Sequence, residues 1–262
     1  MRNLQRYHCP MTTDLFRQDA YLRECSAHIT ALMPDTGGIV LDQTVFYPLG
    51  GGQAGDSGQL VLADGSSIAI ADTRKGKDAE GNPTRDIVHV PAPGQEAQLA
   101  QLAAGMPVTA RIDWERRHRM MRLHTTSHLL CHVVPQLVNG CSITPDYARL
   151  DFAMTDPLDK DTLTAAIAAL VAAAHPLTVA SISDEELDAN PALVKSMSVQ
   201  PPRGTGRIRT IRIGGDGSAP LIDLQPCGGT HVANTAEIGT IVVTKIEKKS
   251  ATTRRVVLGF AQ

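Results

Sequence analysis

The sequence predicts an α+β protein, in which a small N-terminal β-barrel is followed by an α+β domain with helices packed on an antiparallel sheet. Residues from about 20 to 110 alternate apolar and polar side chains over short runs separated by glycine-rich turns, which is typical of barrel strands. After residue 113 a long helical pattern appears, and further helix and strand patterns follow it. We therefore expect two domains, at residues 1–108 and 109–262.

The N-terminal half divides into short runs of strand-forming residues. Asp64-Gly65 lies between two of them and is a typical hairpin turn, whereas residues 73–86 are expected to form a polar loop. The expected strands are 21–32, 38–46, 59–63, 67–72 and 87–90.

A glycine-dense turn interrupts these strands, with five glycines among the eleven residues 48–58. No helical pattern follows it, so it does not match a dinucleotide-binding loop. Two interpretations stay open: the turn is a strained corner of the barrel, or it brings its backbone and the Gln53 amide close to a ligand.

The C-terminal half begins with a strand at 108–112, and Asp113 is a suitable N-cap for a helix that Pro135 should end or kink. Residues 138–140 are expected to form a turn. A second helix should start at Asp156-Pro157, and Ser183 to Glu186 has the form of a capping box. The other expected strands are 147–152, 177–182, 207–213, 219–224, 238–245 and 254–260.

Two short motifs supply four metal donors, His124-Thr-Thr-Ser-His128 and Cys227-Gly-Gly-Thr-His231. Residues i and i+4 of a helix share a face with Cβ atoms about 5–6 Å apart, so both imidazoles of the first motif can reach one ion. The two glycines of the second motif favour a tight turn, from which its cysteine and histidine can approach the same ion. Three imidazoles and one thiolate are typical zinc ligands.

Taken alone, the pair His124 and His128 has a simpler explanation, because two histidines on one helix face are more often a polar surface or a buried pair. His132 continues the helical series, but it lies about 12 Å along the axis from His124, too far for both to bind one ion at about 2 Å. We therefore expect His132 to be a packed or solvated residue and not a ligand.

The net charge of −2 gives no general sign of nucleic-acid or membrane binding, but basic residues gather around the two motifs. Single clusters of this kind are commonly solvated faces, whereas three around one metal motif predict an anionic partner. Only 3% of residues are aromatic, so base stacking on an aromatic platform is not expected. The clusters are Arg111, Arg116, Arg117, Arg119 and Arg122; Arg203, Arg207, Arg209 and Arg212; and Lys245, Lys248, Lys249, Arg254 and Arg255.

The cysteines are odd in number and form no paired framework, which predicts a reducing, cytoplasmic compartment. The N-terminal residues show no apolar core of a secretion signal, and no apolar run approaches 18 residues, so neither secretion nor membrane insertion is expected. The five are Cys9, Cys25, Cys131, Cys141 and Cys227.

Four segments together resemble the AlaX family of alanyl-tRNA editing proteins, in its longer form with an N-terminal barrel, and the related editing domain of alanyl-tRNA synthetase. They are the glycine turn from Phe46 to Asp56, the helix from Asp113 through His124 and His128, the strand 149–152, and the motif from Cys227 to Val232. The small polar residues between the two histidines depart from the alanine that the family often has, which leaves the ligands intact.

The resemblance implies a zinc-dependent deacylase that hydrolyses mischarged tRNA for alanine, with serine as the main wrong amino acid and glycine as a further one. It would act in trans and without ATP, because no synthetase activation motifs are evident. The implied zinc ligands are His124, His128, Cys227 and His231, and Gln53 would project into the pocket. Gly51, Gly52, Arg116 and Arg117 are expected to contact the substrate.

A synthetic pocket built for alanine rejects serine poorly, because serine only adds a hydroxyl. A second, editing pocket must therefore recognise that hydroxyl through a hydrogen-bond partner. The candidates for this partner are Thr125, Thr126 and Thr144. When alanine occupies the pocket, the threonine hydroxyl lacks a hydrogen-bond partner, which would disfavour binding of the correctly charged tRNA. For Thr144, a turn threonine that caps its own backbone is an equally good interpretation.

Two hypotheses for the mechanism stay open. In the first, one ligand is absent or displaced, and zinc-bound water attacks the ester carbonyl. In the second, zinc orients the terminal adenosine while another group positions the water. Other functions also fit the sequence. These are editing of seryl-tRNA for threonine, a non-catalytic zinc-containing tRNA-binding module, and a general metal-dependent esterase.

Overall fold

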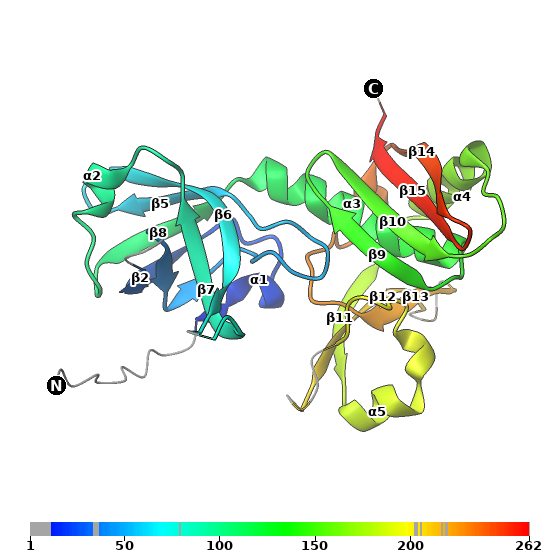
Figure 1. The fold of residues 1–262 in the computed structure, drawn as a ribbon, viewed down its shortest axis with the longest axis horizontal. Helices are drawn as coiled ribbons and strands as arrows, with labels where there is room; N and C mark the ends of the chain where they lie inside the picture. The colour runs from blue at the N-terminus through cyan, green and yellow to red at the C-terminus, as the bar shows by residue number, and fades with distance from the viewer. Residues whose placement is uncertain are drawn as a thin grey trace. The chain divides into compact units, whose positions relative to one another are not determined.

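The computed structural model describes residues 12–33, 37–78, 80–201, 204, 206–215, 217 and 220–261. Cys9, Arg203 and Ala219, which the predictions above include, lie outside these residues. The protein mixes α-helices with a larger proportion of β-sheet, as the sequence predicts (Figure 1). It divides into two compact units, the first with Met1–Gly50 and Gly55–Trp114, the second with Gly51–Ala54 and Glu115–Gln262.

Unit 1 contains a closed barrel of six strands in the order β2-β3-β7-β6-β5-β8, and β8 pairs again with β2. All six pairings are antiparallel. A separate parallel pair joins β1 and β4. The elements are β1 (Thr13–Asp14), α1 (Leu15–Gln18), β2 (Glu24–Leu32), β3 (Ile39–Leu41), β4 (Gln43–Thr44), β5 (Gly58–Leu62), β6 (Ser67–Lys77), β7 (Pro83–Pro91), α2 (Glu96–Leu99) and β8 (Pro107–Ile112).

Alternation along the strands fills the barrel with aliphatic side chains. On β6, Ile68 and Ile70 are buried while their immediate neighbours are exposed, because successive side chains of a strand point to opposite faces. Leu60 of β5 and Ala110 of β8 are paired and fully buried. Burial of this aliphatic core stabilises the unit.

The predicted polar loop at 73–86 is wrong, because β6 continues to Lys77 and β7 already begins at Pro83. At these strand ends, exposed polar side chains alternate with buried residues. The polar side chains therefore lie on the outer face of a strand and do not indicate a loop. The actual turn is short, and Asp78 closes it by accepting a hydrogen bond of 2.7 Å from the Asn82 backbone N–H.

Unit 2 contains an antiparallel sheet in the order β14-β15-β10-β9 and a second antiparallel sheet in the order β11-β12-β13. α4 packs against β14, where the Thr164 hydroxyl accepts a hydrogen bond of 3.1 Å from the Val243 backbone. The elements are α3 (Trp114–Val133), β9 (Val138–Ile143), β10 (Tyr147–Ala153), α4 (Lys160–Ala172), β11 (Leu177–Ile182), α5 (Asp184–Ala189), β12 (Ile208–Gly214), β13 (Leu221–Pro226), β14 (Ile241–Ser250) and β15 (Thr253–Phe260), with 3₁₀ turns at Pro191–Leu193 and Thr235–Ile238.

The long helix α3 confirms the prediction of a helix that ends before Pro135, and most of its residues from Met120 onward are buried. The capping box at Ser183 and Glu186 is also confirmed. Within the described residues, none of the helices combines the length and apolar character that a membrane crossing requires.

Two local predictions in unit 2 are wrong. Val138 to Gly140 begins strand β9 instead of forming a turn, because Val138 pairs with Phe152 and Gly140 with Asp151, and the register irregularity between these pairs takes up Asn139 as the extra residue. The second helix begins at Lys160 and not at Asp156, since the Asp159 side chain caps it by accepting from the Thr162 backbone N–H at 2.8 Å.

Replacing Leu60 by Ala should lower the free energy of unfolding by about 2–5 kcal/mol, because it leaves a cavity in the barrel interior. Chemical denaturation followed by circular dichroism measures this change. The matched control is Gln59→Ala on the same strand, where the side chain points away from the core and the expected loss is below about 0.5 kcal/mol. Equal losses for the two variants would contradict the proposed barrel core.

Candidate metal centre

Two ligand candidates come from the middle of α3. His124 and His128 are four residues apart on the helix, and their ring centroids lie 5.3 Å from one another. Each residue is only 5% exposed. The buried environment therefore holds both imidazoles on one face of α3, as the i, i+4 spacing predicts.

The other two candidates lie in the loop that follows β13. The guanidinium of Arg209 donates from Nη1 to the carbonyl of Cys227 at 2.7 Å and to that of Gly229 at 3.0 Å. Gly229 approaches α3 so closely that a Cβ atom would lie 2.2 Å from Cε1 of His124. Glycine is therefore required at this position for the loop to bring its donors to the helix.

Within the described part of the chain, His124, His128, Cys227 and His231 form a group whose ligand atoms all lie within 4.8 Å of one another. The Cys227 sulfur is 3.5 Å from Nε2 of His124 and 3.3 Å from Nε2 of His231. A tetrahedral ion with Zn–N near 2.0 Å and Zn–S near 2.3 Å requires N···S edges of about 3.5 Å. The two N···S distances match this geometry, and the four side chains could hold a metal ion.

Each of the three imidazoles has a separate partner at Nδ1. His124 Nδ1 lies 2.8 Å from Gln53 Oε1, and His128 Nδ1 lies 2.8 Å from Asp223 Oδ2. The third, His231 Nδ1, lies 3.2 Å from the hydroxyl of Thr125. Because these contacts occupy Nδ1, Nε2 of each ring remains for the metal, and the partners also fix the orientation of the rings.

Gln53 is fully buried and reaches this centre from the glycine turn. Its amide nitrogen donates to the Thr230 hydroxyl at 2.9 Å, while its oxygen also accepts from the Thr230 backbone at 3.1 Å. The turn runs beside β9, where Ile143 donates to the Gly52 carbonyl at 2.8 Å. Both polar atoms of the Gln53 amide therefore form hydrogen bonds within unit 2.

Gly51 and Gly52 both have positive φ angles, 58° and 85°, in the region that favours glycine. A Cβ atom on Gly52 would lie 3.0 Å from the carbonyl oxygen of Cys141 on β9. These two glycines allow the turn to run close beside β9, which determines where the Gln53 side chain lies.

Asp223 was not predicted from the sequence, although it is central to the site. It is 2% exposed, and it also accepts from Gln225 Nε2 at 2.8 Å and forms a close ion pair with Lys195. Asp223, Gln225 and Cys227 alternate along one segment, so the period of a strand could have indicated that their side chains share a face.

The electrostatics favour a thiolate at Cys227. Burial raises the pKa of this thiol, but the charges of His124 and His231 outweigh burial and hold the pKa well below its usual value. By contrast, burial raises the pKa of both Cys131 and Cys141 to about 12, so these neighbouring thiols stay protonated. Only the thiolate form binds a metal, which distinguishes Cys227 from its neighbours.

The histidines respond differently to their surroundings. Burial and the charge of His124 hold the pKa of His231 well below its usual range. Burial also lowers the pKa of His128, but hydrogen bonds and charges from Asp223 and Cys227 outweigh it and raise the pKa to about 9. For Asp223, the His128 and Lys195 interactions overcome burial and lower its pKa to about 2.

The remaining predicted residues lie in different surroundings. The Thr144 hydroxyl donates to the Tyr147 carbonyl at 3.0 Å, and it accepts from the backbone of Asp146 at 3.3 Å, as in a turn that caps itself. Thr125 is fully buried, and its hydroxyl accepts from the Val232 backbone at 3.3 Å. The Thr126 hydroxyl donates to a carbonyl of its own helix.

The three other predicted residues on α3 differ mainly in exposure. Arg117 is fully buried, whereas Arg116 is partly exposed. His132 is exposed and does not belong to the group of four ligands.

Residues 208–257 match the family described as the second additional domain of threonyl and alanyl tRNA synthetases. An alanyl-tRNA editing protein AlaX-M of Saccharolobus solfataricus is 34% identical over 253 residues, which cover 94% of this chain and 98% of the relative. The chain belongs to the AlaX family of alanyl-tRNA editing proteins.

A second AlaX-M protein of this family, from Methanosarcina acetivorans, is 31% identical over 94% of this chain and 97% of its own length. The chain is also 34% identical to an alanine–tRNA ligase of Metallosphaera sedula over 91% of its length, but it spans only 25% of that ligase. The similarity to AlaX proteins thus extends over both units, including the glycine turn and both metal motifs.

Replacing Asp223 by Asn should weaken metal binding about 10- to 100-fold, because it removes the negative charge that orients His128 and makes its ring a stronger ligand. Competition for zinc against a chromophoric chelator measures the change. Asp161→Asn on the exposed side of α4 removes the same charge away from the site and should bind zinc as the wild type does. Unchanged affinity in Asp223→Asn would disprove this role.

Zinc affinity should rise with pH by about tenfold per unit until about pH 9, where His128 has lost its proton. The sign follows from the raised pKa: below that value the imidazole carries a proton, and zinc must displace it. Cys227 contributes no further rise in this range, because its pKa is already well below its usual value. Chelator competition at several pH values measures the slope, and a constant affinity from neutral pH upward would refute the expectation.

Proposed function

We propose that this protein is a zinc-dependent deacylase that hydrolyses the ester of mischarged tRNA for alanine, acting in trans and without ATP. Serine is the proposed main wrong amino acid, and glycine is a further one. The observation that carries the proposal is the set of three imidazoles and one thiolate, with each Nδ1 held by a separate partner. Family membership supports the same reaction.

The donor set supports zinc as the metal, since a thiolate with three imidazoles suits a borderline-soft ion. A bound zinc would be held by His124, His128, Cys227 and His231 and would supply a positive charge that orients the terminal adenosine of the tRNA. Four protein donors would leave no open position on the metal for water. This favours the hypothesis in which another group positions the attacking water.

The proposed roles of the surrounding residues follow from their contacts. Gln53 and Thr125 are positioning residues, because each holds a ligand histidine at Nδ1. The substrate contacts are assigned to the backbone of Gly51 and Gly52 and to Arg116, whose side chain is partly exposed. Arg117 is buried, and its proposed role is to pack α3 in place. The Thr144 hydroxyl could hydrogen-bond to the serine of the substrate only if its bond to the Tyr147 carbonyl opens.

The proposal includes an N-terminal barrel domain at 1–108 and a tRNA-editing domain at 109–262. The two compact units support this layout, with the difference that the turn 51–54 groups with the second unit. A cytoplasmic location is also proposed, since the free cysteines suit a reducing compartment where tRNA is charged.

Hydrolysis of seryl-tRNA for alanine should be faster with the protein than without it, while alanyl-tRNA should remain charged. Replacing Cys227 by Ala should lower the rate about 100-fold, because loss of the metal would leave the charged 3′ end of the tRNA misplaced in the pocket. Release of radiolabelled amino acid measures the rates for seryl-, glycyl- and alanyl-tRNA, with and without a chelator. Cys25→Ala, which removes a thiol from unit 1, is the matched control.

Three outcomes would redirect the proposal. Faster hydrolysis of seryl-tRNA for threonine would assign the protein to threonyl editing, which the matched synthetase domain description also covers. Binding of tRNA without hydrolysis would indicate a binding module. Full activity of Cys227→Ala after removal of zinc would rule out any metal-dependent mechanism.

A further inference from the structure

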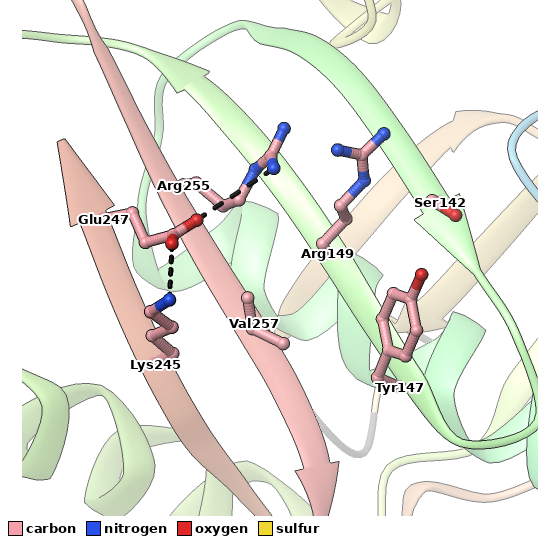
Figure 2. Close-up of a pocket in the computed structure, with 7 residues that line it drawn as sticks. All are labelled: Ser142, Tyr147, Arg149, Lys245, Glu247, Arg255 and Val257. Carbon is pink, nitrogen blue, oxygen red and sulfur yellow. Dashed lines mark ion pairs between the residues drawn. The ribbon is translucent and has the colours of Figure 1, made fainter. Parts of the chain in front are cut away.

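The outer face of the four-stranded sheet in unit 2 carries a row of polar side chains in an open depression of about 340 Å³ (Figure 2). On β10, Ala148, Leu150 and Phe152 are buried, so Tyr147 and Arg149 point to the other face. The residues that line the depression are Ser142, Tyr147, Arg149, Lys245, Glu247, Arg255 and Val257.

The strand register brings these side chains together from all four strands. Arg149 pairs with Ser142 on β9 and with Val257 on β15, and Val257 pairs in turn with Lys245 on β14. Neighbouring strands lie about 4.8 Å apart, so Arg149 and Lys245, two strands apart, are separated by about 10 Å. The face is therefore a row of donors that runs across the strands.

The charge of this surface, which we name the basic sheet face, is positive. Its basic residues are Arg149, Lys245, Lys249 and Arg255, and its acidic residues are Asp151 and Glu247. Lys249 follows Glu247 by two residues on β14, where alternate side chains share a face, and its charge also lowers the pKa of both acidic side chains. Four basic and two acidic groups give a net charge of +2, whereas the whole chain has −2.

Most of these charges are already paired. Arg255 binds Asp151 through two parallel contacts, 2.7 Å from Nε to Oδ1 and 2.8 Å from Nη2 to Oδ2. Lys245 pairs with Glu247 at 2.5 Å. Arg149, by contrast, makes no ion pair or side-chain hydrogen bond with any residue that the structure describes, and Figure 2 shows its side chain between those of Arg255 and Tyr147.

We propose that the basic sheet face binds the phosphate backbone of the tRNA, with Arg149 as its central contact. Arginine and lysine, together with the hydroxyls of serine and tyrosine, are the usual partners of nucleic-acid phosphates, and this face offers all four kinds of donor. Tyr147 is 41% exposed and can offer its hydroxyl. The inference rests on the proposed function, which supplies the RNA.

The position of β9 connects this face with the metal centre. Ser142 points to the basic sheet face, and the next residue, Ile143, pairs with Gln53, whose amide holds His124. Strand β9 thus contributes Ile143 to the surroundings of the candidate metal centre and Ser142 to the proposed row of phosphate contacts. An RNA whose charged 3′ end reaches the metal centre past β9 would bring its preceding phosphates over Arg149.

Replacing Arg149 by Gln should weaken binding of uncharged tRNA for alanine and reduce the slope of log Kd against log salt by about 1, because one phosphate contact is lost. Fluorescence anisotropy at several salt concentrations measures both quantities. Arg149→Lys keeps the charge and should retain the wild-type slope. Zinc content and thermal unfolding of each variant show whether unit 2 remains folded.

The matched control is Lys160→Gln, which removes one exposed positive charge from α4, the helix that packs against the edge strand β14, and Lys160 does not line the depression. It should keep the wild-type slope. If Arg149→Gln and Lys160→Gln bind tRNA alike while the wild type hydrolyses seryl-tRNA, the inference is wrong and the proposed function stands. If the wild type does not bind tRNA at all, both are overturned.

Discussion

The hydrogen bond between the Gln53 amide and Nδ1 of His124 is the interaction on which the organisation of unit 2 depends. It joins a short turn early in the chain to the middle of α3, 71 residues later. The same amide also secures Thr230 in the loop that carries Cys227. One buried side chain thus holds two ligand segments in register, and the glycines around it allow the close approach of backbone that this requires.

The sequence was sufficient to predict which four candidate ligands lie together, because i, i+4 spacing on a helix and a glycine turn constrain donors locally. It was insufficient for their partners. Asp223 lies 95 residues from His128, and only the packing of β13 against α3 brings them together. Gln53 was expected to enter a pocket, and whether it also meets the substrate stays a prediction, but its polar atoms are used to hold His124 and Thr230.

The fold was predictable to a similar degree. Long patterns such as α3 and the capping box at Ser183 were found, since they depend on neighbouring residues. The strand at Val138 was missed because its Asn and Gly indicate a turn unless the pairing with β10 is known. The charge of the basic sheet face is similar. The sequence predicts a cluster of cations, but only the structure shows that Asp151 and Glu247 pair with two of them and that Arg149 forms no ion pair with a described residue.

The four candidate ligands and their buried partners balance one another's charge. Three imidazole rings with centroids 4.2–5.3 Å apart cannot all be protonated together in a buried site, because like charges in a medium of low polarity repel strongly. The site divides its charge accordingly, with His128 matched by Asp223 and the Cys227 thiolate facing the other rings. A metal cation replaces the displaced proton of His128 without leaving Asp223 unpaired, since Lys195 also compensates that carboxylate. Folding of unit 2 and metal binding should therefore stabilise one another.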